Sequence, residues 1–262
     1  MIGISIATKW EYEVTLEYFS IKNNERFSYP YGEYFIRTIN DTELVFYSTG
    51  VRKVNGVGGN QYMISKFNLA KVIVAGTCAG IDEKYSNLDI FVPNKAVQYD
   101  CTVKEIEPFI KQSFIVDIDL SRYGGDDFYT GTIGTADKAV VMWEDYLELK
   151  ENEITIADTE ASAIAYICKK NDVECIIIKG ISDFPTDESN TDKLQSNMEQ
   201  INVYLENTPK VMNKIFENYL KRFKIIIKNE YNEAAELKNR RRTKVRWGFF
   251  MRWLTKLDKV FH

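Results

Sequence analysis

The chain has 262 residues, of which 45% are hydrophobic and 27% charged, and its formal net charge is −4. This composition is typical of a globular protein with one large α/β domain or two small ones. The single histidine is the last residue, His262. A Ser-His-Asp triad, a Cys-His pair and a metal site built from histidines are therefore excluded within the fold. Acid–base chemistry must use carboxylates, or less readily Lys or Tyr.

The cysteines and the start of the chain indicate an intracellular protein. Cys78, Cys101, Cys168 and Cys175 form no CxxC pair and have no partner at zinc-binding spacing, so we expect reduced, mostly buried thiols. The first residues, MIGISIATKWE, lack a basic segment and turn polar after seven positions, which does not fit a signal peptide. The longest apolar runs have the length of a strand and are too short to span a bilayer. A cytoplasmic location is therefore expected.

Hydrophobic patterning predicts strands and helices that alternate along the chain. The first expected elements are a strand at Met1–Ala7, a helix from Trp10 to Phe19, a hairpin of Tyr34–Ile39 and Glu43–Ser48, and a glycine-rich turn at Gly50–Gly59 leading into a helix that ends near Phe67. Then follow strands at Lys71–Ala75, Asp89–Val92, Lys95–Tyr99, Tyr129–Thr135 and Ile154–Ala157, a helix at Thr159–Lys170, a buried strand at Cys175–Lys179, and helix from Asn190 onward.

This alternation predicts a three-layer α/β/α fold with a central, mostly parallel, mixed sheet and a C-terminal helical extension. Such sheets bind ligands at the carboxyl ends of their strands. The segments expected there are Thr8–Glu11, Gly76–Ile81, Thr135–Val140, Asp158–Glu160 and Ser182–Phe184.

Three of these strand ends carry carboxylates, namely Glu11, Glu160 and Asp183. Each has a simple structural explanation. Glu11 fits a first-turn acid that faces water, Glu160 fits a favourable charge at a helix N-terminus, and Asp183 fits the start of a turn. Together, however, they converge on the edge where this architecture binds ligands.

Five separated motifs occur in an order that is similar to a known family. They are Trp10–Val14, Thr49–Asn55, Gly76–Gly80, Ala157–Ala161 and Lys179–Asp183. On these motifs the chain resembles, over about residues 1–223, the nucleoside phosphorylase and nucleosidase superfamily. Within it, the chain looks similar to the bacterial methylthioadenosine/S-adenosylhomocysteine nucleosidases. The resemblance implies a nucleoside phosphorylase-like catalytic domain, cleavage of the N-glycosidic bond of a purine nucleoside without metal or cofactor, and a homodimer.

The resemblance also implies roles for individual residues. Asp183 would be the general acid at N7 of the purine, with Ser182 orienting it. Glu160 would hold the ribose diol. Glu11 would be the base for the attacking water, and Thr77 would help to place that water. This set suits the reaction, because its transition state resembles an oxocarbenium ion, the departing base needs a proton and the water must be activated.

Further contacts follow from the same resemblance, together with departures from the family pattern. Val51 would lie near the 5′ substituent, and backbone groups around Val140 would meet the base. Thr159 stands where the family has a methionine, so an apolar contact to the ribose is lost. Arg52 replaces a glycine, either as a solvated surface residue or as a contact to an anionic group on the 5′ side.

A second departure concerns the aromatic side chain that stacks on the base. The family places a phenylalanine in a Ser-Gly-Asp-x-Phe pattern, whereas this chain has Ala139 within Thr135–Ala139. Losing that ring removes a stacking contribution of about 0.5–1.5 kcal/mol. Phe184 or Trp143 are the aromatic residues that we consider as substitutes. These changes bear on the identity of the substrate more than on the reaction.

Hydrolysis is favoured over phosphorolysis, which stays the alternative. Phosphorolysis needs an anion site, usually with arginines. Bacterial purine phosphorylases of this superfamily carry an arginine two residues before the glycine equivalent to Gly76, and this chain has Val74 there. Glu11 would also repel phosphate. A third interpretation is a non-catalytic nucleoside-binding module, in which Thr159 and Ala139 mark a decayed site.

The segment 224–262 needs a separate interpretation, because it carries 11 Lys/Arg against four Asp/Glu and leaves the preceding residues near −11. A dense cationic patch at Lys238–Lys244 precedes an apolar helical stripe formed by Trp247, Phe250, Leu254, Leu257 and Phe261. Such a basic amphipathic helix suits an anionic membrane surface or a protein partner. A terminal helix packed on the protein's own acidic body is equally compatible. Nucleic acid is disfavoured, because no recognised binding motif accompanies the charge.

Overall fold

The centre of the fold is a sheet whose inner strands are buried on both faces. The computed structural model describes residues 1–39, 41–101, 114–123, 128–140, 143–185 and 193–220. The strands are β1 (Ile2–Ile6), β2 (Phe27–Tyr29), β3 (Gly32–Ile39), β4 (Thr42–Ser48), β5 (Lys71–Gly80), β6 (Ile90–Phe91), β7 (Lys95–Gln98), β8 (Ile115–Asp117), β9 (Thr132–Thr135), β10 (Ile156–Asp158) and β11 (Glu174–Asp183). The helices are α1 (Lys9–Tyr18), α2 (Lys53–Phe67), α4 (Trp143–Glu151), α5 (Ala161–Lys170) and α6 (Lys193–Lys214), with shorter helical turns at Asn23–Glu25, Tyr99–Cys101 and Ile215–Leu220.

The described strands form one mixed sheet in which the central strands β4, β1, β5 and β11 run parallel. β10 pairs antiparallel with the last residues of β5, where Ile156 lies opposite Gly80 and Ala157 opposite Ala79. β9 and β7 run parallel to β10. The carboxyl ends of β5 and β10 therefore overlap, and the residues that end two opposed sets of strands come together.

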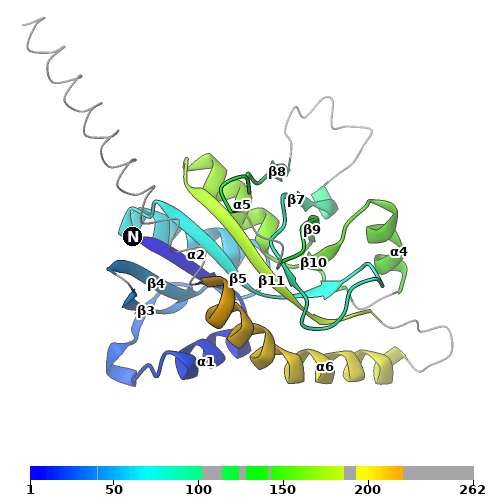
Figure 1. Cartoon of the computed structure of the whole chain (residues 1–262), viewed down its shortest axis with the longest axis horizontal. Coiled ribbons are helices and arrows are strands. Elements are labelled where there is room, and N and C mark those ends of the chain that lie inside the picture. Colours follow the sequence, from blue (N-terminus) through cyan, green and yellow to red (C-terminus); the bar gives the residue numbers. More distant parts are fainter. Residues whose placement is uncertain (40, 102–113, 124–127, 141–142, 186–192, 221–262) are drawn as a thin grey trace, which may run out of the picture. The chain divides into compact units, whose positions relative to one another are not determined.

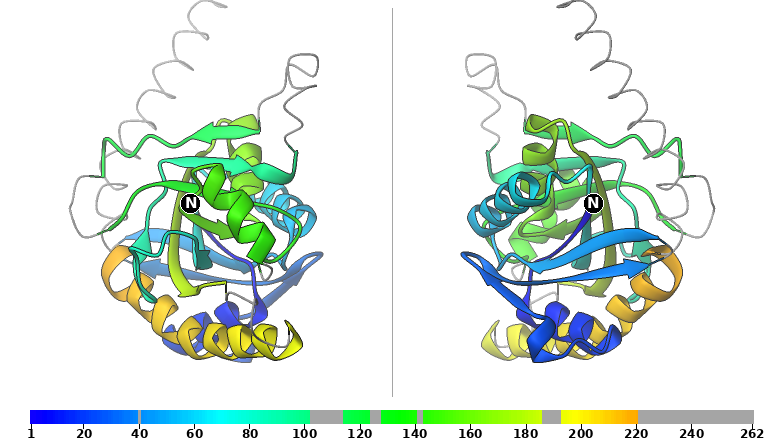
Figure 2. Two further views of the ribbon diagram at one scale, coloured as in Figure 1. Left: turned by 90° about the vertical axis from the view of Figure 1, so that its right-hand side faces the viewer. Right: turned by 90° about the vertical axis from the view of Figure 1, so that its left-hand side faces the viewer.

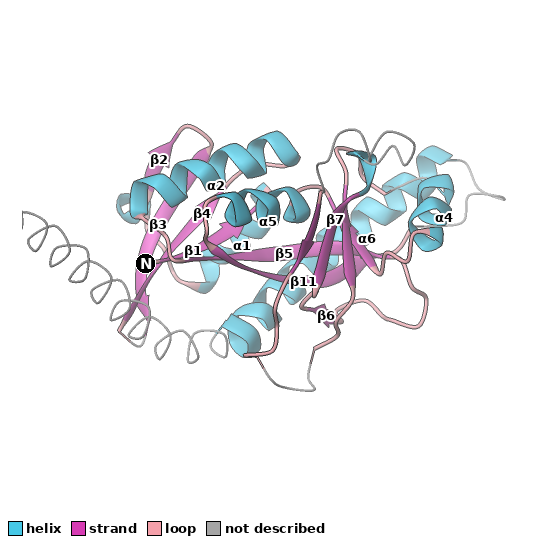
Figure 3. Cartoon of the chain, turned by 90° about the horizontal axis from the view of Figure 1, so that it is seen from above, coloured by secondary structure: helices cyan, strands magenta, loops and turns pink. Residues whose placement is uncertain are grey.

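Helices cover both faces of this sheet, with α2 and α5 on one face and α1 and α6 on the other (Figures 1 and 2). Seen from above, α2 and α5 lie next to each other across the strands (Figure 3). All residues of β1 are buried, without alternation, as is typical of strands covered on both sides. The predicted three-layer α/β/α architecture with a mixed, centrally parallel sheet is confirmed.

The strands β5 and β11 are longer than their apolar runs predict. They remain paired with each other from Lys71 and Glu174 up to Cys78 and Ile181, so the ladder extends beyond the hydrophobic segments. The register then shifts between Ile181 and Asp183. A bulge of this kind bends a strand and re-aims its side chains. It puts the last residues of β11 into a local geometry that the sequence pattern does not reveal.

The glycine-rich segment lies mostly inside α2, which corrects the prediction of a turn before the helix. The helix begins at Lys53 and includes Gly56 and Gly59. A Cβ at position 56 would lie 3.3 Å from side-chain atoms of Glu160 and Ile164. Glycine therefore allows α2 to approach α5 closely, and this packing outweighs its low helix propensity. The elements β2, β8 and α4 were not predicted.

The predicted domain boundary near residue 223 and the basic segment 224–262 lie outside the described residues, and both stay predictions. Among the described residues, no helix is long and apolar enough to cross a membrane. The four cysteines are free thiols, of which Cys78 and Cys168 are buried while Cys101 and Cys175 are partly exposed. The expectation of mostly buried thiols therefore holds for two of them.

Candidate active site

One cavity lies where the carboxyl ends of the opposed strands meet. Its volume is about 260 Å³. Each of the five strand-end segments predicted from the sequence contributes to it, together with residues of α6. The lining residues are Thr8, Trp10, Glu11, Thr77, Cys78, Ala79, Lys138, Ala139, Val140, Ala157, Asp158, Thr159, Glu160, Lys179, Ser182, Asp183, Gln200, Ile201 and Tyr204.

Glu11 is fixed between α1 and β5 and is only 1% exposed, so it is not a first-turn acid facing water. Its Oε2 accepts a hydrogen bond from Thr8 N at 2.9 Å, while Thr8 Oγ1 accepts from Glu11 N at 3.2 Å. These reciprocal bonds form a capping box at the start of α1. Glu11 Oε1 accepts from N and Oγ1 of Thr77 at 2.6 and 2.8 Å. Three of about four acceptor positions of the carboxylate are therefore occupied, which leaves one for a water.

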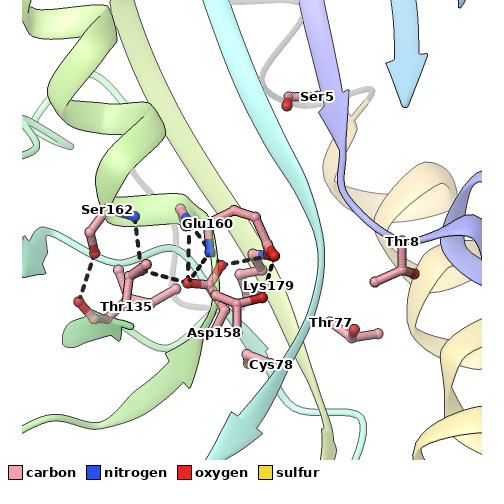
Figure 4. Close-up of polar contacts among 12 residues, drawn as sticks. Ser5, Thr8, Thr77, Cys78, Thr135, Asp158, Glu160, Ser162 and Lys179 are labelled. Atoms are coloured by element: carbon pink, nitrogen blue, oxygen red, sulfur yellow. Dashed lines mark hydrogen bonds and ion pairs between the residues drawn. The ribbon is translucent and has the colours of Figure 1, made fainter. Parts of the chain in front are cut away.

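Asp158 links β10, α5 and β11 (Figure 4). It accepts hydrogen bonds from Thr135 Oγ1 at 2.6 Å and from Ala161 N at 3.1 Å. Its Oδ2 lies 3.0 Å from Lys179 Nζ, in an ion pair whose side chains are 4% and 2% exposed. Asp158, and not Glu160, therefore receives the backbone N–H groups at the N-terminus of α5, where a negative charge is favoured.

Glu160 is 3% exposed and contacts α2 through the backbone of Arg52. Its Oε1 accepts from Arg52 N at 2.6 Å and from the Thr159 hydroxyl. Burial, followed by the nearby Asp158, raises the pKa of Glu160, while Lys179 and these two hydrogen bonds oppose that rise. Thr159 thus orients the carboxylate that the resemblance assigns to the ribose diol.

Lys179 is a buried cation among carboxylates. Burial lowers the pKa of Lys179, but Asp158, Glu11 and Glu160 together raise it above its usual value. A Cβ at Gly76 would lie 2.6 Å from Glu11 Oε1 and 3.1 Å from Lys179 Nζ. Only glycine therefore fits beneath these two side chains, and Lys179 stays protonated at neutral pH.

Asp183 differs from these residues because its partners are neutral. Its Oδ1 lies 2.5 Å from Ser182 Oγ, and its Oδ2 accepts from Gln200 Nε2 at 2.7 Å. The bulge at the end of β11 brings the consecutive side chains of Ser182 and Asp183 together, whereas in a regular strand they point to opposite faces. Burial raises the pKa of Asp183, and the two hydrogen bonds oppose the rise without cancelling it.

The Ser182 hydroxyl is arranged to follow a proton on Asp183. Its Oγ lies within hydrogen-bonding distance of two acceptors, Asp183 Oδ1 at 2.5 Å and the carbonyl oxygen of Cys78 at 3.1 Å. A hydroxyl carries one hydrogen. It donates to Asp183 when that carboxylate is ionised. When Asp183 is protonated, Asp183 donates to Ser182 and the Ser182 hydrogen turns to Cys78. Both protonation states of Asp183 are thus satisfied.

Seven of the ten residues predicted for the site line the cavity, and three do not. The seven are Glu11, Thr77, Val140, Thr159, Glu160, Ser182 and Asp183. Val51 is 43% exposed outside the lining, and Arg52 contributes only its backbone N–H, to Glu160. The Phe184 ring packs over Gly80, so it is not a stacking substitute at Ala139. The side chain of Trp143 lies outside the described residues.

Residues of α6 were missed by sequence reasoning. Gln200 contacts Asp183, Tyr204 donates to Thr8 Oγ1 at 3.1 Å, and Asn207 Nδ2 donates to Ser182 O at 2.7 Å. Their spacing of four and three residues puts them on one face of a helix. A polar stripe within this helix was the available signal. Lys179 was likewise quoted in a motif without a role.

A second cavity of about 300 Å³ lies at the amino end of β11. It is lined by Val116, Asp117, Ile118, Asp119, Arg122, Ala165, Lys169, Val173, Glu174 and Cys175. None of the carboxylates predicted for chemistry belongs to it. Across the part of the chain that the structure describes, no group of three or more His, Cys, Asp or Glu side chains is placed to hold a metal ion. The first cavity is therefore the candidate active site.

The fold and this cavity agree with comparisons to known proteins. Residues 1–217 match the family model described as the phosphorylase superfamily, and the chain belongs to that family.

Similar proteins include nucleosidases from bacteria. The chain is 24% identical over 206 residues to a 5′-methylthioadenosine/S-adenosylhomocysteine nucleosidase of Geobacillus sp. (strain WCH70), covering 71% of this chain and 88% of that protein. Among solved structures, the nucleosidase of the same name from Helicobacter pylori matches with a TM-score of 0.67 and 19% identity, covering 82% of this chain and 97% of the other. The futalosine hydrolase of Helicobacter pylori matches with a TM-score of 0.66, 19% identity and the same coverage. At these identities the solved structures support the fold.

Proposed function

We propose that the protein hydrolyses the N-glycosidic bond of a purine nucleoside and releases the free base. The observation that carries this proposal is the meeting of Glu11, Glu160 and Asp183 in one cavity, each almost completely buried. Relatives named 5′-methylthioadenosine/S-adenosylhomocysteine nucleosidase support the same reaction and suggest a related substrate.

The proposed mechanism uses these carboxylates for different tasks. Asp183, whose pKa burial raises, gives its proton to N7 of the purine as the bond between C1′ and N9 breaks. A water adds its oxygen to C1′ and gives a proton to Glu11. Glu160 accepts hydrogen bonds from the ribose diol, which holds the sugar while positive charge develops on it. Thr77, through its two bonds to Glu11, keeps that base oriented toward the water.

Water is favoured over phosphate as the nucleophile. The described residues that line the cavity include two cations, Lys138 and Lys179. Lys138 pairs with Asp145, and Lys179 pairs with Asp158. Glu11 lies beside the proposed nucleophile position and repels an anion. Val74, which stands where phosphorylases carry an arginine, is a buried residue of β5.

The test is an incubation of the full-length chain with methylthioadenosine, S-adenosylhomocysteine, adenosine, inosine and futalosine, with and without inorganic phosphate. Chromatography of the free base gives the rate. Release that does not depend on phosphate is expected. Asp183→Asn is expected to slow it by roughly 10²–10⁴-fold, the usual contribution of a general acid. Asp119→Asn, an exposed aspartate outside this cavity, is the matched control with unchanged activity.

The other outcomes separate the alternatives. Base release only with added phosphate would identify a phosphorylase. Nucleoside binding without turnover of any compound would favour the non-catalytic module, for which Thr159 and Ala139 are the motivating departures. The homodimer and the cytoplasmic location stay predictions from the resemblance, and sedimentation of the purified chain tests the first.

A further inference from the structure

The side chain of Gln200 holds both Asp183 and the segment after β9. Its Nε2 donates to Asp183 Oδ2 at 2.7 Å and to the backbone oxygen of Val140 at 3.1 Å. A backbone carbonyl only accepts hydrogen bonds, so the NH₂ group must face Val140. The opposite orientation would put the Gln200 oxygen against that carbonyl. The two neighbours therefore fix which way the amide points.

The remaining oxygen of this amide is buried without a donor. Gln200 is 5% exposed and lines the cavity. Among the described residues, no group donates a hydrogen bond to Gln200 Oε1. Buried acceptors are almost always paired in folded proteins, because leaving one unpaired is unfavourable. A donor supplied by a bound ligand would satisfy this oxygen.

The position of Gln200 relative to Asp183 indicates which part of a ligand would supply the donor. This step rests on the proposed function, in which Asp183 protonates N7 of the purine. The substituent at C6 lies on the same edge of the base as N7, and Gln200 is hydrogen-bonded to Asp183. A 6-amino group carries hydrogens for an acceptor there. A 6-oxo group presents a second acceptor and would be repelled by Oε1.

We propose that Gln200 is a specificity-determining residue, whose Oε1 accepts a hydrogen bond from the 6-amino group of a 6-aminopurine nucleoside. The same amide positions Asp183 through its NH₂ group. One side chain of α6 thus couples recognition of the base to orientation of its proton donor. A purely positioning role makes a different prediction, because it affects all purine nucleosides equally.

The experiment compares three nucleosides that differ only at C6, namely adenosine, inosine and purine riboside, which carries hydrogen there. kcat/KM is measured for the full-length wild type and for Gln200→Met, which keeps the size of the side chain and removes its amide. We expect the adenosine to purine riboside ratio to fall about tenfold, the size of one hydrogen bond. We also expect inosine to gain relative to purine riboside. Intrinsic reactivity differences cancel when the variant is divided by the wild type.

Two further variants guard the interpretation. Gln200→Asn keeps an amide but withdraws it by one methylene, and a fall in the same ratio is expected if Gln200→Met does not fold. Gln61→Met is the matched control, because Gln61 lies on α2 and pairs with Asn171. Its ratio is expected to equal that of the wild type. Thermal unfolding of each variant verifies that it is folded.

The outcomes distinguish failure of this inference from failure of the proposed function. If wild type cleaves adenosine and Gln200→Met slows all three nucleosides equally, Gln200 only positions Asp183 and the specificity role is wrong. If wild type cleaves no nucleoside, the proposed function fails. In that case equilibrium binding of adenosine and purine riboside to both proteins decides the role of Gln200. An equal preference in wild type and variant overturns it, and a preference lost in the variant supports it.

Discussion

Two buried aspartates line the same cavity in contrasting surroundings. Asp158 at the end of β10 pairs with Lys179 and receives the N-terminus of α5. Asp183 at the end of β11 has the neutral partners Ser182 and Gln200, and no ion pair within the described residues includes it. The cation makes Asp158 part of the fold, whereas burial without a cation raises the pKa of Asp183. Surroundings, and not residue type, decide which carboxylate exchanges a proton.

The largest expected effect breaks the ion pair. Lys179→Met leaves Asp158 as an uncompensated buried charge, close to Glu11 and Glu160, and is expected to lower the free energy of unfolding by about 3–5 kcal/mol. Urea denaturation at pH 7 measures it. The control is Lys84→Met, whose ion pair with Asp82 is solvent-exposed, and which is expected to leave stability unchanged. A loss as small as that of the control would show that Asp158 does not depend on Lys179.

A smaller effect concerns the stability of Asp183→Asn against pH. Because the folded-state pKa of Asp183 is raised, its carboxyl contributes stability that is fully present below its ordinary pKa and is lost as pH rises through the folded pKa. Asparagine mimics the protonated form at every pH. The variant is therefore expected to unfold like wild type in acid and to become more stable than wild type as the pH rises toward neutrality. Urea unfolding from pH 5 to 8 measures the difference.

The control for this pH dependence has the opposite sign. Hydrogen bonds from Ser121 lower the pKa of the exposed Asp119. Its carboxylate therefore contributes stability above its ordinary pKa, which is lost as pH falls. Asp119→Asn is expected to gain no stability over wild type at neutral pH. A gain of the same size in both variants would show that burial of Asp183 is not the cause.

The smallest expected effect lies at Arg52, which donates to Glu160 on the charged side of the cavity. Its φ of 80° and ψ of 159° belong to a region that glycine adopts readily and other residues do not. Arg52→Gly and Arg52→Ala both remove the side chain, but only alanine keeps the strain. Glycine is expected to be more stable than alanine by about 1 kcal/mol, after its greater unfolded-state entropy is subtracted. Equal melting temperatures would show that the backbone is not strained here.

Sequence reasoning reached the fold and most of the site because the relevant signals are local. The strand β1 and the start of α1 follow from the hydrophobic pattern and the Thr8–Glu11 capping box. It failed where glycine serves close packing, as at Gly56 in α2, and where a bulge re-aims side chains, as at the end of β11. Propensity describes one residue in its own segment and contains no information about the neighbouring helix.

By itself, the sequence determined the order of elements, the absence of histidine chemistry and the placement of Glu11, Glu160 and Asp183 after or at the ends of strands. Only the tertiary structure decided their partners. The antiparallel pairing of β10 with β5 brings Asp158 to Lys179, and α6 brings Gln200 to Asp183. These pairs join segments that are separate in the chain. Their electrostatics depends on burial and distance, and the packed structure alone fixes both.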